Sequence, residues 1–224
     1  MLKKMYDWID ERVDVTPIWR DIADHEVPEH VNPAHHFSAF VYCFGGITFF
    51  VVVIQILSGM FLTMYYVPDI ENAWKSVYYL QTEVAHAQIV RGMHHWGASV
   101  VIVMLLLHTL RVFFQGAYKK PRELNWMVGV LIFFVMLGLG FTGYLLPWDN
   151  KAYFATTVGI QMAEQVPFIG EQLKILLAGD ASIIGAQTLT RFFAIHVFFL
   201  PAALFALLAV HFILIRRQGI SGPL

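Results

Sequence analysis

Residues 92–110 read GMHHWGASVVIVMLLLHTL, nineteen residues without a single Asp, Glu, Lys or Arg. An apolar helix of about this length crosses the ~30 Å hydrocarbon core of a bilayer. Backbone groups in lipid need internal partners, and stretches without period-2 alternation favour helices over a closed barrel. Three other charge-free stretches cover 30–68, 124–148 and 192–215. The sequence predicts an all-α membrane protein with four transmembrane helices, at about 37–66, 89–117, 125–146 and 188–218.

The composition of the whole chain agrees with this class. Of the 224 residues, 58% are apolar and 14% are charged, whereas soluble domains are about 45–50% apolar and about 25% charged. The same values exclude a disordered chain. The net charge of −1 argues against a nucleic-acid partner, which needs a basic surplus. A single cysteine, Cys43, excludes an internal disulfide framework, and ten histidines remain to be explained.

Basic residues are distributed unevenly about the four predicted helices. Four spans place both termini on one side, and ten of the fifteen Lys and Arg residues fall there. The positive-inside rule makes this the cytoplasmic side. We recognise no secretory signal and expect 1–36 to form a cytoplasmic or interfacial segment. Residues 37–224 form the four-helix domain, whose outer loop, 147–187, is expected to contain short surface helices at 152–163 and 170–177.

Histidines within predicted spans are costly and point to function. His94 and His108 are 14 residues apart, which at 100° per residue is 40° short of four turns, with about 21 Å of rise. They therefore share one helix face, while His95 points about 140° away from His108. His196 and His211 are 15 residues apart, 60° beyond four turns, and Pro201 between them can kink or bulge the helix.

The second and fourth spans both run from the outer side to the inner side, so packing them together would place His94 opposite His196 near the outer surface and His108 opposite His211 near the inner one. Neutral imidazole is a good metal ligand, and two bis-histidine sites at two depths suit two stacked haems. Zinc is disfavoured because a tetrahedral site needs four ligands at one depth. Any one of these histidines taken alone would more often be a hydrogen-bonded packing residue.

Glycines and arginines accompany the histidines. Gly45 and Gly59, like Gly129 and Gly143, are 14 residues apart, so small residues can face two macrocycles at matching depths. Simple helix packing is the alternative explanation. Arg91 and Arg191 precede His94 and His196 by three and five residues and can pair with haem propionates, although interfacial snorkelling would also place them there. Arg111, Lys119, Arg216 and Arg217 could serve the inner site in the same way.

Several motifs give the chain a family resemblance over nearly its whole length. They are RGMHHWGAS (91–99), KKPRELNW (119–126), GFTGYLLPWD (140–149), LTRFFAIH (189–196) and HFILIRRQGISGPL (211–224). The chain resembles the cytochrome b of quinol-oxidising complexes, in its short, four-helix b6 type. The segment PAHHFSAFVYCFGG (33–46) is most similar to the Gram-positive bacterial menaquinol–cytochrome c reductase version.

The resemblance implies a transmembrane electron-transfer subunit that works in a Q cycle coupled to proton translocation. Two b haems would carry electrons from an outer quinol oxidation site to an inner quinone site. His94 and His196 would bind the outer haem, and His108 and His211 the inner one. In the family, the cysteine of the YCxGG motif carries a third, c-type haem through one thioether bond, and here this is Cys43. From its own sequence context, Cys43 reads as a small apolar residue.

The quinone sites follow from the resemblance as well. Candidates for the outer pocket are Gly143, Tyr144, Pro147, Trp148, Ala152 and Phe154. Candidates for the inner pocket are Arg216 and Asp21, the second as a proton carrier, although an aspartate at position 21 is more often a solvated interfacial residue. Menaquinone is the expected quinone.

The family also implies partners and a location. These are a Rieske iron–sulfur protein, a c-type cytochrome, a homodimeric complex and lipid, in a bacterial plasma membrane. A Pro-Glu-Trp-Tyr motif is missing, so we expect a separate small membrane subunit to complete the outer site and the chain to be inactive alone. A generic di-haem membrane anchor and a non-haem transporter with a polar histidine track are the rival classes.

Overall fold

The structure is a computed structural model that describes residues 3–5, 7, 42–179 and 184–219. The chain divides into two compact units, 1–40 and 41–224, and the second unit is described here by itself. The predicted interfacial segment lies almost wholly outside the described residues, as do Asp21 and the predicted start of the first span at residue 37.

Four helices in the described part of the chain are long and apolar enough to cross a membrane, which confirms the predicted fold class. The first three are α4 (Phe44–Thr63), α6 (Ala87–Phe114) and α7 (Glu123–Leu145). The fourth runs over Ala186–Gln218. It consists of α10 (Ala186–Ala194), a π-helical turn η2 (Ile195–Phe199) and α11 (Leu200–Gln218).

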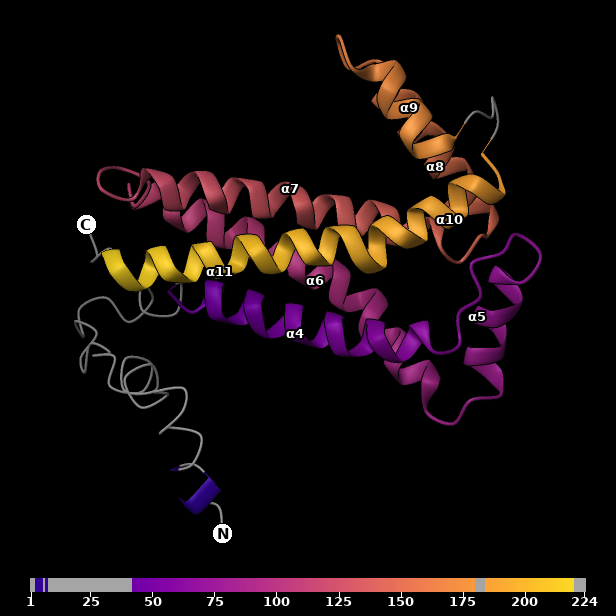
Figure 1. The fold of residues 1–224 in the computed structure, drawn as a ribbon, viewed down its shortest axis with the longest axis horizontal. Coiled ribbons are helices and arrows are strands. Elements are labelled where there is room, and N and C mark those ends of the chain that lie inside the picture. The colour runs from indigo at the N-terminus through magenta and orange to yellow at the C-terminus, as the bar shows by residue number, and fades with distance from the viewer. Residues whose placement is uncertain (1–2, 6, 8–41, 180–183, 220–224) are drawn as a thin grey trace. The chain divides into compact units, whose positions relative to one another are not determined.

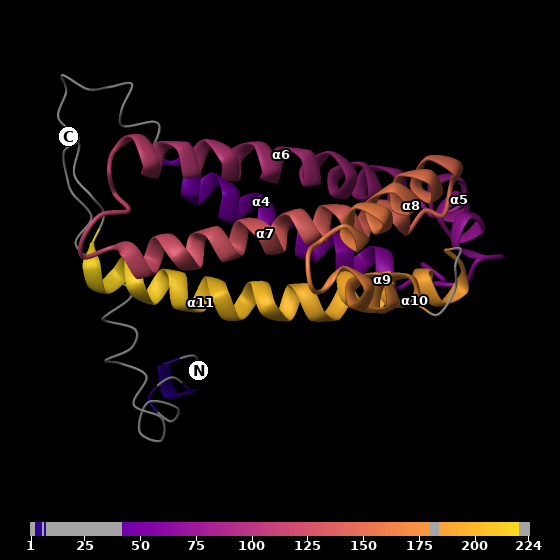
Figure 2. The ribbon, with the colours of Figure 1, turned by 90° about the horizontal axis from the view of Figure 1, so that it is seen from above.

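The four long helices lie side by side as two pairs (Figures 1 and 2). Helix α4 packs along α6, and α7 packs along α11, whereas contacts between the pairs are sparse. Apolar residues fill the middle of the bundle and hold the pairs together. This mid-membrane cluster consists of Val52, Val101, Leu105, Ile132, Met136 and Leu204, and each member is buried.

Three short helices gather at one end of the bundle, which we call the outer end in keeping with the charge asymmetry (Figures 1 and 2). The sequence predicts two of them, α8 (Asn150–Glu164) and α9 (Gly170–Ala178). Asp149 begins α8 as its N-cap, because its carboxylate accepts a 2.8 Å hydrogen bond from the Ala152 amide. The third, α5 (Ala73–Thr82), is not predicted, although its buried residues at positions 73, 76 and 80 share one helical face.

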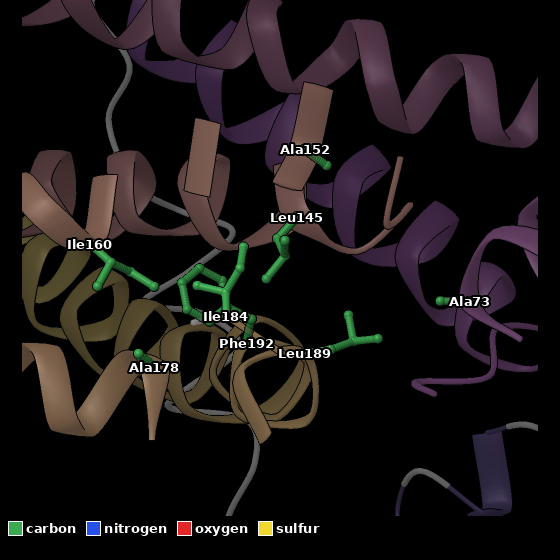
Figure 3. Close-up of a cluster of buried hydrophobic side chains, with 8 residues drawn as sticks. All are labelled: Ala73, Leu145, Ala152, Ile160, Ala178, Ile184, Leu189 and Phe192. Atoms are coloured by element: carbon green, nitrogen blue, oxygen red, sulfur yellow. The ribbon is translucent and has the colours of Figure 1, made fainter. Parts of the chain in front are cut away.

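A second apolar cluster fixes these short helices on the ends of the long ones (Figure 3). Leu145, Leu189 and Phe192 are fully buried within it, so the outer end of α7 is held against α10. Nearby, the Tyr66 hydroxyl donates a 2.6 Å hydrogen bond to the carbonyl of Leu146, which links the end of α4 to the end of α7. Burial raises the pKa of Tyr66, so the phenol stays protonated as the donor. The outer end is therefore a rigid platform on which the two helix pairs meet.

The opposite end, called the inner end, is held by the loop between α6 and α7. The Arg122 guanidinium donates to the carbonyls of Gln218 and Gly219, each at 3.3 Å. The Gln218 amide returns a 2.9 Å hydrogen bond to the carbonyl of Pro121. The two bonds from Arg122 satisfy carbonyls at the C-terminal end of α11, where the helix leaves them without partners. The inner part of α11 is thereby fixed against α7.

Candidate functional site

Within each helix pair, a glycine of one helix faces a histidine of the other. A Cβ atom built on Gly59 would lie 3.2 Å from Cε1 of His94. At the inner end of the same pair, the Cβ on Gly45 would lie 3.1 Å from Cε1 of His108. The α7–α11 pair repeats the arrangement, with 2.6 Å between Gly143 and His196 and 3.6 Å between Gly129 and His211. Each glycine thus leaves the space that a histidine ring occupies, so both glycine pairs serve the histidines directly.

The histidines of the two pairs meet across the bundle. The ring centroids of His94 and His196 are 6.3 Å apart, and their planes are inclined by 83°. A metal–imidazole bond is about 2.0–2.1 Å long, so this separation leaves room for one metal centre between the rings. At the inner end, His108 and His211 are close enough that a charge on one ring would act on the other. His95 is exposed and its ring contacts Trp96 instead, as its predicted rotation requires.

The π-helical turn at Ile195–Phe199 explains why the second histidine pair is 15 residues apart. A π turn accommodates one extra residue, so the spacing from His196 to His211 acts as 14 residues of α-helix. It then equals the spacing of His94 and His108 and of both glycine pairs. Pro201 follows at the start of α11 and lacks the amide that a regular α-helix would use at that point. Of the kink and the bulge that Pro201 allows, the structure has the bulge, and it restores the register.

Two hydroxyls, which sequence reasoning did not single out, contact the outer histidines. Ser58 Oγ lies 3.0 Å from His94 Nδ1, and Thr142 Oγ1 lies 3.2 Å from His196 Nδ1. Each residue immediately precedes the glycine that faces the same ring. The sequence does carry a signal for them, because a hydroxyl residue directly before a glycine occurs at both 58–59 and 142–143.

The inner end contains buried polar atoms without hydrogen-bond partners. Burying such an atom unpaired costs roughly 1–3 kcal/mol, so each of them is a candidate to pair with a polar group of a bound molecule. The Arg111 guanidinium, stacked 3.9 Å above the Tyr42 ring, is the charged member. The atoms are Tyr42 Oη, Arg111 Nε and Nη2, Gln115 Oε1, Asn125 Oδ1, His211 Nδ1 and Gln218 Oε1. We call these six residues the inner polar cluster.

The other predicted site residues lie at the two ends of the bundle. At the outer end, Arg91 donates a 3.0 Å hydrogen bond to Gln81, and Arg191 donates to the carbonyls of Ile175 and Leu176 at the end of α9. Arg191 therefore anchors α9 in this structure. Tyr144 is exposed, and half-buried Trp148 makes an edge contact with Tyr153. The half-buried residues Pro147 and Arg216 lie beyond the end of α7 and in the last turn of α11, respectively.

Cys43 lies at the inner end, as the N-cap residue of α4, with its side chain exposed. It is two residues from Gly45, which faces His108. The thiol is thus accessible near the inner histidine layer. Among the residues that the structure describes, no three metal-ligating side chains gather in one place. The histidines meet as pairs, an arrangement that fits a metal already held in the plane of a macrocycle.

Comparison with known proteins bears on this arrangement. The cytochrome b/b6/petB family matches residues 28–219. The chain is 83% identical over its full length, and over the relative's full length, to the menaquinol:cytochrome c reductase cytochrome b subunit of Bacillus subtilis (strain 168). It is 82% identical, again over both full lengths, to the subunit of that name from Geobacillus thermodenitrificans.

A solved structure of a hyperthermophilic respiratory Complex III shares the fold. It superposes with a TM-score of 0.81 and is 34% identical, covering 97% of this chain. The match spans 56% of the chain in that complex. Sequence, fold and paired histidines thus agree, and the chain belongs to the cytochrome b/b6 family, whose members bind haem b and quinone.

Proposed function

We propose that the chain is the transmembrane electron-transfer subunit of a menaquinol–cytochrome c reductase. Electrons from an outer quinol oxidation site cross the bilayer through two b haems to an inner quinone site, in a Q cycle coupled to proton translocation. The observation that carries the proposal is the set of four glycine–histidine contacts, two at each depth. The names of two relatives that are more than 80% identical over their full length, each a menaquinol:cytochrome c reductase cytochrome b subunit, support it.

In this proposal His94 and His196 would ligate the iron of the outer haem, and His108 and His211 that of the inner haem. The facing glycines keep each ring close to its neighbouring helix. A bound haem contributes one-electron redox chemistry at its iron, tuned by the axial ligands. The mid-membrane cluster lies between the two layers and excludes water from the path. Moving one electron across the membrane potential costs about 2.3 kcal/mol per 100 mV.

Arginines are proposed to hold carboxylates beside each layer. Arg91 is well placed at the outer end because the hydrogen bond that it donates goes to the exposed side chain of Gln81, which it can leave. Arg191 would first have to leave the α9 carbonyls. At the inner end, Arg111 has two buried nitrogens without partners, so it can receive a propionate as a bidentate partner. Arg216 and Asp21 remain candidates for the inner quinone site, and Gly143, Tyr144, Pro147 and Trp148 for the outer one.

A reduced-minus-oxidised visible spectrum of the complex tests the proposal. We expect b-type haem bands and a pyridine haemochrome content of two b haems per chain. Oxidation of added menaquinol with reduction of a c-type cytochrome should accompany them. A purified complex without b-haem absorbance would contradict the proposal and favour a transporter. Two b haems without quinol-dependent reduction of cytochrome c would favour a di-haem membrane anchor.

Cys43 is proposed to hold a third, c-type haem through one thioether bond. Its exposed thiol at the inner end, two residues from the glycine that faces His108, supports this. Haem staining of a denaturing gel should mark the wild-type chain and leave Cys43→Ser unstained, because only a covalent haem survives denaturation. The content of b haem should be the same in both. A colourless wild-type band, or a stained Cys43→Ser band, would overturn the assignment.

The proposed partners are a Rieske iron–sulfur protein, a c-type cytochrome and a separate small membrane subunit, in a homodimeric complex surrounded by lipid. The relatives' names, which place them in a reductase, support an assembly of several subunits. We propose a bacterial plasma membrane with both termini cytoplasmic. The excess of Lys and Arg at the inner end supports this orientation.

A further inference from the structure

The outer histidine layer is built symmetrically from two helices that are distant in the sequence. Ser58 on α4 and Thr142 on α7 each lie within 3.2 Å of Nδ1 of the histidine on the neighbouring helix. Both residues are buried, with exposed fractions of 5% and 4%. A small residue would suffice for packing, so the repeated hydroxyl indicates a requirement for a hydrogen bond at Nδ1.

The direction of these hydrogen bonds follows from counting protons. A hydroxyl has one proton and two lone pairs. Ser58 donates its proton to the carbonyl of Ile54 at 2.6 Å, and Thr142 donates to the carbonyl of Gly138 at 2.7 Å. With its proton directed to that carbonyl, each hydroxyl accepts from the histidine, which then carries its proton on Nδ1, where the backbone carbonyl of Gln55 or Leu139 is a second acceptor. The neutral ring then has its lone pair on Nε2, the form in which imidazole binds a metal.

The inner layer has a different chemistry at the equivalent positions. The residues that precede Gly45 and Gly129 are Phe44 and Val128, and neither carries a hydroxyl. His211 Nδ1 is buried and meets no side-chain hydroxyl, and its hydrogen-bonding neighbour is the backbone carbonyl of Asn125, just outside ordinary hydrogen-bond geometry. The two layers therefore share glycines and histidines, but they differ in the groups that lie beside Nδ1 of the histidines.

We propose that Ser58 and Thr142 are positioning residues for the outer haem, an inference that rests on the proposed function. By accepting from Nδ1–H, each hydroxyl fixes the tautomer and the rotation of its ring. It also raises the basicity of the ligand, as outer-shell acceptors do. A more basic imidazole would stabilise ferric iron and lower the potential of a haem bound at the outer layer. The inner layer has no hydroxyl at the equivalent positions, so the effect would favour electron transfer from the outer to the inner layer.

Potentiometric titration of the intact complex tests the inference at the two haems separately. Ser58→Ala and Thr142→Val should each shift the midpoint potential of the outer haem to a more positive value. The inner potential should stay unchanged, and the double variant should shift the outer one further. Ser58→Thr and Thr142→Ser keep a hydroxyl and should titrate like wild type. The electron paramagnetic resonance signal of the ferric outer haem should change in the same variants.

Thr48→Val is the matched control. Thr48 lies on α4, is buried, and donates to the carbonyl of Phe44 at 2.7 Å, as Ser58 does to Ile54. It is ten residues from Ser58 and far from the outer layer, so the outer potential should be unchanged. This variant separates the loss of a helix-bonding hydroxyl from the loss of the contact with the ligand.

The outcomes are distinct. Selective loss of the outer haem in Ser58→Ala or Thr142→Val, with retention in the conservative variants, would also support positioning. An unshifted outer potential, equal shifts of both haems, or loss of haem in the conservative variants would overturn the inference. A wild-type complex without b haem would refute the proposed function, whereas two normal b haems with unshifted potentials would refute only the role of the hydroxyls.

Discussion

Replacing His94 by alanine is expected to remove the outer b haem, while His95→Ala keeps both b haems. His94 lies opposite His196 at a centroid separation of 6.3 Å and contacts the hydroxyl of Ser58. His95 is exposed, and its ring contacts Trp96. The two substitutions remove the same side chain from adjacent positions, so they differ only in the face that is affected. The ratio of b haem to protein should fall by half in the first variant alone.

His108→Ala completes this comparison. It should remove the inner haem and leave the outer one, because His108 pairs with Gly45 and His211 instead. Potentiometric titration then identifies which of the two haems each variant has lost. Equal haem loss in His94→Ala and His95→Ala would contradict the assignment of faces. Loss of the same haem in His94→Ala and His108→Ala would contradict the two depths.

The spans and the histidine faces could be predicted because both depend on the local sequence. Charge-free length defines a span, and the helical repeat fixes which residues of one helix share a face. The boundaries of α6 and α7 consequently fall within about three residues of the predicted ones. The short helices α8 and α9 were likewise accessible from the apolar residues in the outer loop.

Contacts between helices could not be obtained in this way. The helical repeat says nothing about the rotation of one helix relative to its neighbour, which packing decides. That Gly45 and Gly59 face the macrocycles stays a prediction, whereas their contacts with the rings of His108 and His94 came only from the structure. The contact between Ser58 and His94 depends on the same rotation. The inner polar cluster joins α6, α7 and α11, and only folding brings its residues together.

The π-helical turn could be predicted only in part. Pro201 indicated an irregularity in the fourth helix, but a kink and a bulge remained equally open. Only the structure shows that one extra residue is absorbed between His196 and His211. The 15-residue spacing of His196 and His211 is therefore equivalent to the 14-residue spacing of His94 and His108, because the bulge absorbs one residue.

The four glycines provide the sharpest test of the packing, since each leaves a different amount of space. A Cβ at Gly143 would lie 2.6 Å from Cε1 of His196, and 3.1 Å from both ring nitrogens. A methyl group there must displace the ring, and overpacking of this kind costs about 1–3 kcal/mol. We expect Gly143→Ala to lose most of the outer haem and to lower the melting temperature of the complex.

The loss should follow the available space at each glycine. Gly45→Ala and Gly59→Ala, with Cβ distances of 3.1 and 3.2 Å, should retain part of the inner and outer haem, respectively. Gly129→Ala, at 3.6 Å, makes an ordinary van der Waals contact and should lose least.

Gly140→Ala is the control on α7, because a Cβ there meets nothing within 4 Å. It tests whether any alanine in this helix is harmful, and it should leave the haem content unchanged. Alanine is also more stable than glycine inside a helix by about 0.5–1 kcal/mol. A loss of haem or stability in Gly143→Ala would therefore occur in spite of this gain. Equal losses at Gly129 and Gly143 would show that the haem, and not the histidine ring, sets the space at these positions.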